Sequence, residues 1–359
     1  MFTWHRHAPL DTTPDTAVNK EAHFAAAGFN TLPAVRVEIV THMWPSESHP
    51  ESGVFVRDQV EALRRMGADV VVASFPSGGT AYLAAARKLR RDRRRSRPDV
   101  THAHYGLSGW SALAGGLPRL VVTFHGTDLR HRAVGPLSRL LARLVTLPAV
   151  VSTSLAREAL PGAGTRRRVL VLPCGVDTLR FRPLERREAR SRLGLDPDAP
   201  YLLFPADPER ATKRYDRARR VAALLPGVEL LALRGVAPSE VPFWVNAANA
   251  VLVSSEREGF GLAALEALAC DVPVLSTPVG VAPIALAGVR GTLCEPFEER
   301  RWLSFARALV ESRDPRVRGR ARAELFSSDR MAARVLVAYR ELIASKGRGQ
   351  PESSGHQRA

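Results

Sequence analysis

Short β-rich runs alternate with segments of helical period along most of the chain, and this alternation constrains the fold more than any other feature. Strands that alternate with helices are typical of βαβ units, in which the strands lie parallel. In the first half, the pattern predicts helices at 54–65 and 82–95. It predicts strands at residues 35–40, 68–74, 100–103, 120–124, 150–154 and 169–173.

The same alternation starts again after a stretch rich in proline and arginine at 180–200. Strands are expected at 201–204, 228–233, 250–254 and 273–276, and helices at 216–225, 261–269, 298–311 and 331–344. No close internal repeat is visible, so the two series predict two separate doubly wound domains. Ligands of such sheets usually lie at the carboxyl ends of the strands, against helix N-termini, so an interdomain cleft is the expected site.

A length of 359 residues suits about two domains. We expect a loose tail at 1–34, a Rossmann-like domain at 35–182, a second at 183–346 and a loose tail at 347–359. Whether the last helix of the second domain packs back on the first domain is left open. Because no apolar run approaches a membrane span and no signal peptide is recognisable, the sequence predicts a protein kept inside the cell.

The charge balance is strongly basic, with 52 Lys and Arg against 36 Asp and Glu, or +16. A polyanion, an anionic membrane, a phosphorylated ligand and an arginine-rich proteome all remain open as reasons. The densest basic run, 87–97, is either a solvated helix face or a contact with an anionic membrane surface. It lacks interleaved aromatic residues and no DNA-reading motif accompanies it, so no nucleic-acid partner is expected.

Neither a disulfide framework nor a metal site is indicated. The three cysteines, Cys174, Cys270 and Cys294, have no paired spacing. His102 and His104 lie two residues apart, but no third ligand is in register. No metal and no cofactor are therefore expected.

The most informative segment is 254–268, which follows an apolar strand and opens a helix. Gly259 and Gly261 permit close backbone approach, and the start of the helix favours an anion such as a diphosphate. Glu258 precedes the helix and Glu266 lies inside it, with seven residues between them. Glu266 stands in a nearly apolar helix, where an unpaired acid is costly, so a binding role is favoured over a purely structural one.

At these residues the chain resembles the family-4 retaining glycosyltransferases, which have the GT-B fold of two Rossmann-like domains facing a cleft. The resemblance rests on the Glu258-to-Glu266 segment with its Gly-Phe-Gly, on 173–177 and on 273–277, and it spans about 35–345. It implies that Glu258 binds hydroxyls of the donor sugar and Glu266 the ribose. Backbone contacts to the donor are implied for Gly259, Phe260, Gly261 and Leu262.

A leaving diphosphate also requires cations. Lys213 follows a predicted strand and is expected to stabilise the diphosphate, with Arg210 or Arg214 as a second charge. The family usually has an arginine five residues before this lysine, where this chain has Pro208.

Two positions in the first half complete the predicted site. His125 lies just past a predicted strand and resembles the family's active-site histidine, close to the donor sugar and acceptor. Gly53 resembles the glycine of the family's first strand-to-helix loop. A further departure is Ile284, in a segment where the family commonly has a glutamate.

The resulting expectation is a cytoplasmic retaining glycosyltransferase, with peripheral membrane attachment left open. It would transfer a sugar from a nucleotide-diphosphate donor to a hydroxyl acceptor, with His125, Lys213 and Glu258 as the central residues. A GT-B sugar-nucleotide epimerase and an inactive transferase scaffold that binds polyanions or membranes are the alternatives.

Overall fold

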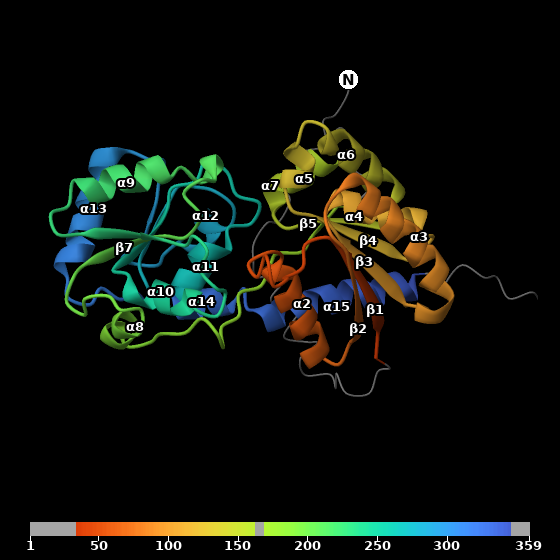
Figure 1. The fold of residues 1–359 in the computed structure, drawn as a ribbon, viewed down its shortest axis with the longest axis horizontal. Coiled ribbons are helices and arrows are strands. Elements are labelled where there is room, and N and C mark those ends of the chain that lie inside the picture. Colours follow the sequence, from red (N-terminus) through yellow and green to blue (C-terminus); the bar gives the residue numbers. More distant parts are fainter. Residues whose placement is uncertain (1–33, 162–168, 346–359) are drawn as a thin grey trace, which may run out of the picture. The chain divides into compact units, whose positions relative to one another are not determined.

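The computed structural model describes residues 34–161 and 169–345. The predicted tails at 1–34 and 347–359 lie outside these residues, apart from Ala34. The described residues form two parallel α/β sheets with their helices (Figure 1). We call residues 36–171 together with 328–344 the N-lobe, and residues 186–324 the C-lobe.

The N-lobe sheet has six parallel strands in the order β2-β1-β3-β4-β5-β6. Every residue of β3 and β4 is buried, as expected for central strands of a parallel sheet that is covered on both faces. The strands are β1 (Arg36–Thr41), β2 (Asp69–Ser74), β3 (Val100–His104), β4 (Leu120–Phe124), β5 (Leu147–Val150) and β6 (Leu170–Val171).

The predicted strand at 150–154 is wrong. The strand lies at Leu147–Val150, where Pro148 stands opposite Val122 of β4, and a helix begins at Thr153. Proline is unusual inside a sheet because it cannot donate to the ladder, which hid the start of this strand.

The pattern predicts no helix between residues 96 and 161, where the N-lobe has four, and small residues hide the signal of the first of them. The segment Gly106–Ala114 has little periodicity, yet it is helical and packs against β4 and α6. A Cβ at Gly109 would lie 2.6 Å from Leu141 Cδ2, so the close packing requires glycine there. The N-lobe helices before the last are α2 (Val54–Arg65), α3 (Gly79–Ser96), α4 (Gly106–Ala114), α5 (Thr127–Arg130), α6 (Val134–Leu144) and α7 (Thr153–Ala159).

The C-lobe sheet has five parallel strands in the order β11-β10-β9-β7-β8. They are β7 (Tyr201–Phe204), β8 (Glu229–Ala232), β9 (Ala250–Val253), β10 (Val274–Ser276) and β11 (Leu293–Cys294). The helices are α8 (Arg186–Arg192), the 3₁₀ helix η2 (Ala211–Lys213), α9 (Tyr215–Ala223), α10 (Val241–Ala247), α11 (Leu262–Ala269), α12 (Ala282–Ala285), α13 (Glu299–Glu311) and α14 (Arg320–Glu324). Both sheets thus have the doubly wound α/β architecture that the sequence predicts.

The last helix, α15 (Ser328–Ala344), packs in the N-lobe beside α2 (Figure 1). Its buried residues Met331, Val335 and Tyr339 belong to the same core as Ile39 of β1 and Val60 of α2. A single parallel bridge between Val176 and Ser327 marks where the chain returns.

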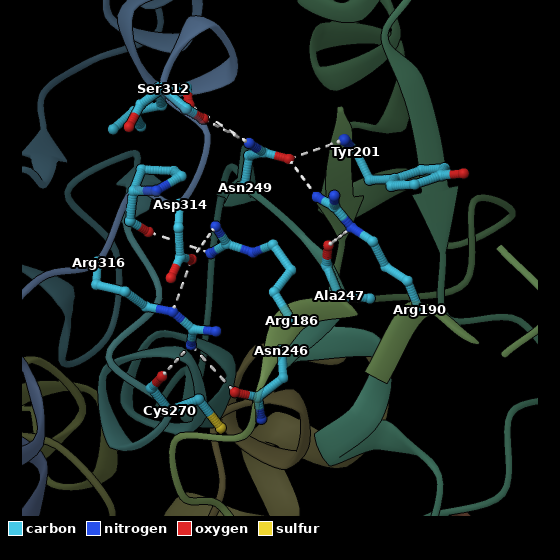
Figure 2. A network of polar contacts seen from close by, with 12 residues as sticks. Arg186, Arg190, Tyr201, Asn246, Ala247, Asn249, Cys270, Ser312, Asp314 and Arg316 are labelled. Carbon is cyan, nitrogen blue, oxygen red and sulfur yellow. Dashed lines mark hydrogen bonds and ion pairs between the residues drawn. The ribbon is translucent and has the colours of Figure 1, made fainter. Parts of the chain in front are cut away.

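A buried arginine holds α8 against the amino ends of β7 and β9. Arg190 is 3% exposed and donates to the Ala247 carbonyl at 2.9 Å, to the Pro197 carbonyl at 2.9 Å and to Asn249 Oδ1 at 2.8 Å. Asn249 Oδ1 also accepts from the Tyr201 amide at 3.0 Å (Figure 2). One guanidinium therefore satisfies three acceptors, two of which belong to the buried residues Ala247 and Asn249.

Replacing Arg190 by methionine is expected to lower the free energy of unfolding by about 3 kcal/mol or more, because it leaves buried acceptors without a donor. Urea unfolding of the two proteins measures the difference. The matched control is Arg187→Met on the same helix. Its ion pair with Asp198 is exposed by 56% and 68%, so a change below about 1 kcal/mol is expected. Equal small losses in both variants would contradict this account.

Candidate functional site

The segment after β9 and the start of α11 have the geometry of a site that admits a ligand close to the backbone. Gly261 is the N-cap of α11 with φ +88°, a conformation that favours glycine. Gly280, on the neighbouring loop after β10, lies so close that a Cβ there would overlap the Phe260 carbonyl oxygen. The first amides of α11 have no partners within the helix, so this end of the helix favours negative charge.

Lys213 and Glu258 form an ion pair beside this helix start. Lys213 Nζ lies 2.7 Å from Glu258 Oε1 and 2.8 Å from Oε2, and the side chains are 17% and 11% exposed. Ser255, which is buried, donates a further hydrogen bond to Glu258 Oε1 at 2.7 Å. The structure therefore brings together a cation and an acid that are 45 residues apart in the sequence.

Hydrogen bonds to backbone carbonyls connect the loop that holds Lys213 to the loop that holds Glu258. Ser254 Oγ donates to the carbonyl oxygens of Lys213 and Arg214, at 3.2 and 2.9 Å. The Glu256 amide donates to the Thr212 carbonyl at 3.0 Å. The position of the lysine is consequently set by the strand end of β9 as well as by its own loop.

The segment after β4 contacts the same loop. A Cβ at Gly259 would overlap the His125 carbonyl oxygen, and a Cβ at Gly126 would lie 3.4 Å from Gly259 Cα. The two backbones are thus in direct contact, with no side chain between them. Consequently His125 of the N-lobe lies next to the residue that follows Glu258 in the C-lobe.

A buried aspartate holds the His125 segment in place. Asp128 accepts hydrogen bonds from the amides of His125, Gly126 and Gly106, at 3.0, 2.9 and 3.1 Å. Burial raises the pKa of Asp128 to about 6, against the lowering effect of these amides. Phe55 of α2 lies with its ring centroid 4.9 Å from that of His125.

Gly53 occupies the start of α2, where a side chain cannot fit. It has φ +65°, and a Cβ there would overlap the Met43 carbonyl oxygen. The loop after β1 therefore closes tightly on itself. Phe55, two residues further on, contacts His125, so this glycine belongs to the surroundings of that histidine.

Glu266 lies in α11 with its carboxylate near three other charged groups. Burial raises the pKa of Glu266 to about 7, while Arg180 and Lys213 act to lower it and Asp58 acts to raise it. Arg180 is paired with Asp58, with Nη2 2.6 Å from Oδ2. Within the described residues no group donates a hydrogen bond to the Glu266 carboxylate, so its acceptor capacity remains available to a ligand.

The remaining predicted donor residues differ in their surroundings. Phe260 is buried, and its carbonyl accepts from the Val281 amide at 2.7 Å, while Leu262 begins α11. Arg214 is held by Asp216, at 2.8 Å from both carboxylate oxygens, and by Glu256 at 2.6 Å. Arg210 is exposed. Arg214 is thus committed to Asp216 of α9 and to Glu256 of the loop after β9, which leaves Lys213 as the cation next to Glu258.

The two departures from the family pattern also have defined places. Pro208 is partly exposed in the loop after β7, ahead of η2. Ile284 lies in the short helix α12 and is 49% exposed. Neither residue contributes a charge where the family usually has one.

Sequence reasoning missed Asp58, Arg180 and Ser255. Asp58 and Arg180 are 122 residues apart, and no local pattern links them. Ser255 stands inside the recognised segment, and a hydroxyl three residues before Glu258 could have been suspected of contacting it. For His104 a metal site is not indicated by the sequence, and strand-end packing or contacts at the acceptor site are the expected roles; its Nδ1 lies 3.1 Å from His125 Nε2, a contact that the sequence does not predict.

Two kinds of feature are absent from the described part of the chain. Across residues 34–161 and 169–345, no helix combines the length and the apolar character needed to cross a bilayer. In the same residues, no group of three or more His, Cys, Asp or Glu side chains is arranged to hold a metal ion.

Comparison with known proteins gives consistent matches over both lobes. The model of Glycosyltransferase Family 4 matches residues 35–180, and that of Glycosyl transferases group 1 matches 202–312. A D-inositol 3-phosphate glycosyltransferase 1 from Catenulispora acidiphila is 34% identical, over 70% of this chain and 74% of that protein. A D-inositol 3-phosphate glycosyltransferase from Actinosynnema mirum is 31% identical, over 85% and 87%.

Solved structures share the fold. Sucrose-phosphate synthase from Thermosynechococcus elongatus aligns with a TM-score of 0.69 at 19% identity, over 87% of this chain and all of that chain. Anabaena Alr3699/HepE, solved with UDP and glucose, aligns with a TM-score of 0.60 at 15% identity, over 88% and 100%. Together with the family matches, these findings show that the chain belongs to the family-4 retaining glycosyltransferases of the GT-B fold.

Proposed function

We propose that the nucleoside diphosphate sugar binds across the start of α11. In this arrangement Lys213 contacts the diphosphate, Glu258 the sugar hydroxyls and Glu266 the ribose, and His125 lies beside the reacting sugar and the acceptor hydroxyl. The observation that carries the proposal is the Lys213–Glu258 ion pair on a loop whose Gly259 touches the His125 backbone. A cation, an acid and a histidine are thereby near one another at the ends of two parallel sheets.

Electrostatics support the position of the diphosphate. Breaking the bond between the anomeric carbon and the diphosphate oxygen leaves negative charge on the diphosphate. Lys213 and the unpaired amides at the start of α11 stabilise that charge as it develops. Arg214 is bound to Asp216 and Glu256, so its charge is already compensated.

The Lys213–Glu258 pair keeps both groups in place for the donor. Each partner then exchanges the other for a substrate group: the lysine for the diphosphate, and the glutamate for sugar hydroxyls that donate to it. The Ser255 hydroxyl holds Glu258 during this exchange. The lysine charge is then compensated by the diphosphate and the glutamate charge is stabilised by hydroxyl donors, so neither group is left without a partner.

The acceptor hydroxyl attacks the anomeric carbon on the face that the diphosphate leaves, which gives retention. The new bond joins the acceptor oxygen to the anomeric carbon, and the acceptor proton passes to the departing diphosphate. The names of the two relatives suggest D-inositol 3-phosphate as the first acceptor to test, with inositol as the uncharged comparison. Donor turnover without any acceptor would instead favour the epimerase alternative.

Lys213→Met is expected to reduce kcat by about 10²–10³-fold, because it removes the cation that meets the leaving diphosphate. Release of the nucleoside diphosphate from UDP- and GDP-sugars, with acceptor present, measures the effect. The matched control is Arg257→Met, which removes one positive charge from the exposed part of the neighbouring loop. It should stay within about threefold of the wild type. If the two variants have similar rates, the role of Lys213 is wrong.

The pH dependence of binding tests Glu266. Its pKa of about 7 means that the carboxyl is protonated below this pH and ionised above it. Because an ionised carboxylate accepts hydrogen bonds more strongly, the ribose contribution to affinity should grow as the pH rises through 7. We expect an increase of about fivefold between pH 6 and pH 8, measured by calorimetric titration with UDP or GDP, whichever binds more tightly.

The control for that titration is the matching 2′,3′-dideoxy nucleotide, which has the same phosphates and lacks the ribose hydroxyls. Its affinity should not show the fivefold increase, and neither should that of the Glu266→Gln variant for the ribonucleotide. Parallel pH profiles for the two nucleotides would rule out Glu266 as the ribose ligand.

An anionic membrane surface is the further partner we propose. Support comes from α3, whose residues Arg87, Lys88, Arg90, Arg91, Arg93, Arg94 and Arg95 are all exposed. On α6, the leucines Leu137, Leu140 and Leu144 recur at helical spacing and are 46%, 46% and 52% exposed. Both helices pack against α4. Basic and apolar side chains of this kind suit the headgroup region of a bilayer.

The double variant Arg90→Glu/Arg94→Glu is expected to bind vesicles of phosphatidylglycerol and phosphatidylcholine at least about tenfold more weakly than the wild type. Co-sedimentation at low salt measures this. The control, Arg300→Glu/Arg307→Glu, makes the same charge change at exposed positions of α13. Equal weakening by both variants would indicate a net-charge effect without a surface on α3.

A further inference from the structure

Three histidines of the N-lobe form one continuous cluster behind the candidate site, joined by ring stacking and by hydrogen bonds. His102 and His104 lie on β3, and their rings stack with centroids 4.4 Å apart. His125 follows β4, and its ring lies 5.3 Å from that of His104, with planes 27° apart. His104 Nδ1 is 3.1 Å from His125 Nε2. The cluster thus reaches from the interior of the sheet to the residue that touches Gly259.

Each of these histidines is neutral near pH 7. Burial lowers the pKa of His102 to about 3, with a further contribution from His125. Burial and the neighbouring histidines also hold the pKa values of His104 and His125 well below the usual range. A neutral imidazole carries a single proton, so each ring has one donor nitrogen and one acceptor nitrogen. Once the protonated nitrogen of one ring is fixed, the hydrogen bond to the next ring decides which nitrogen of that ring carries its proton. The hydrogen bonds of the cluster can therefore run in one of two directions.

Gln59 of α2 can fix that direction. Its Nε2 lies 3.5 Å from His102 Nδ1 and 3.5 Å from His104 Nε2. An amide nitrogen only donates, and it has two hydrogens, one for each ring. Both contacted ring nitrogens must then be acceptors, so the proton of each ring lies on its other nitrogen.

The remaining contacts agree with this assignment. With its proton on Nε2, His102 donates to Thr123 Oγ1 at 2.7 Å, and the single lone pair of its Nδ1 accepts from the Tyr339 hydroxyl at 2.6 Å. The 3.5 Å contact of Gln59 with this nitrogen is therefore the weaker of its two amide contacts, and the hydrogen that faces His104 Nε2 is the one that acts on His125. With its proton on Nδ1, His104 donates to His125 Nε2. His125 must then carry its own proton on Nδ1. Within the described residues this nitrogen has no hydrogen-bond partner, and His125 as a residue is partly exposed.

We propose that Gln59, acting through His104, fixes His125 as the Nδ1–H tautomer, so that this ring presents a hydrogen-bond donor to the substrate. The inference rests on the proposed place of His125 beside the reacting sugar. Gln59 and His104 are positioning residues, since neither is assigned a contact with substrate. A ring that presents N–H can bind a substrate oxygen but cannot take the acceptor proton at that nitrogen, in agreement with transfer of that proton to the diphosphate.

The opposite direction of the hydrogen bonds is chemically possible, and it would give His125 the opposite role toward the substrate. If the Gln59 carbonyl oxygen faced the two rings, His104 would donate to it through Nε2 and His125 would donate to His104. His125 would then present a bare Nδ1, which acts as a base. The two arrangements have the same distances between heavy atoms. They differ in which nitrogen of each histidine ring carries the proton, and this difference can be measured.

The test is the tautomer of His125 in the intact protein, read from two-bond ¹H–¹⁵N correlation spectra of ¹⁵N-histidine-labelled enzyme at pH 8. His125 is assigned by comparison with His125→Gln. We expect the protonated, pyrrole-type nitrogen at Nδ1 and the bare, pyridine-type nitrogen at Nε2. A proton on Nε2 in the wild type overturns the inference, whatever any variant does.

A pair of variants tests the part played by Gln59. Gln59→Met removes the donor at similar volume and should produce both tautomers of His125, with kcat lowered about tenfold. The control, Thr123→Val, removes the hydroxyl that accepts from His102 Nε2 and should leave His125 in the Nδ1–H form. A single Nδ1–H tautomer in Gln59→Met would show that Gln59 does not set the direction.

These readouts separate the inference from the proposed function. The spectra report the tautomer without any turnover. If His125→Gln transfers sugar at the wild-type rate, the proposed role of His125 is wrong even where the tautomer is as expected. If His125→Gln is impaired and the wild-type proton lies on Nε2, the function stands and the inference is wrong.

Discussion

The contact between Lys213 and Glu258 is the interaction on which the rest of the site depends. Both side chains are mostly removed from water, and either charge alone in such a place would be costly. Their pairing makes it possible to keep a cation and an acid together beside the start of α11. The Ser255 hydroxyl and the bonds between the two loops then hold the pair where a diphosphate sugar can exchange with it.

Glycine lets the two halves of the site approach each other. Gly259 and Gly126 bring the loop after β9 against the loop after β4 without an intervening side chain. Any larger residue at position 259 would have to displace the His125 carbonyl. The distance between the histidine and the Glu258 loop is therefore a property of the backbone, which makes it less variable than a contact between long side chains.

The sequence predicted most of the fold because hydrophobic periodicity is local. The helix at 54–65 and the strand at 201–204 have the predicted bounds, and the segment that carries Glu258 and Glu266 has the predicted strand–loop–helix order. The helix at 106–114 escaped because its small residues carry no periodic signal. The pairings of Arg180 with Asp58 and of Lys213 with Glu258 depend on tertiary packing, which no pattern along the chain reports.

The return of α15 to the N-lobe has a consequence for biosynthesis. The core around Ile39 and Val60 includes Met331, Val335 and Tyr339, which the ribosome adds some 270 residues after Val60. All of the C-lobe elements have emerged before this core can be completed. The apolar surface of the N-lobe that α15 covers therefore stays exposed until the C-lobe segment has been synthesised. A chaperone would be most useful during this interval.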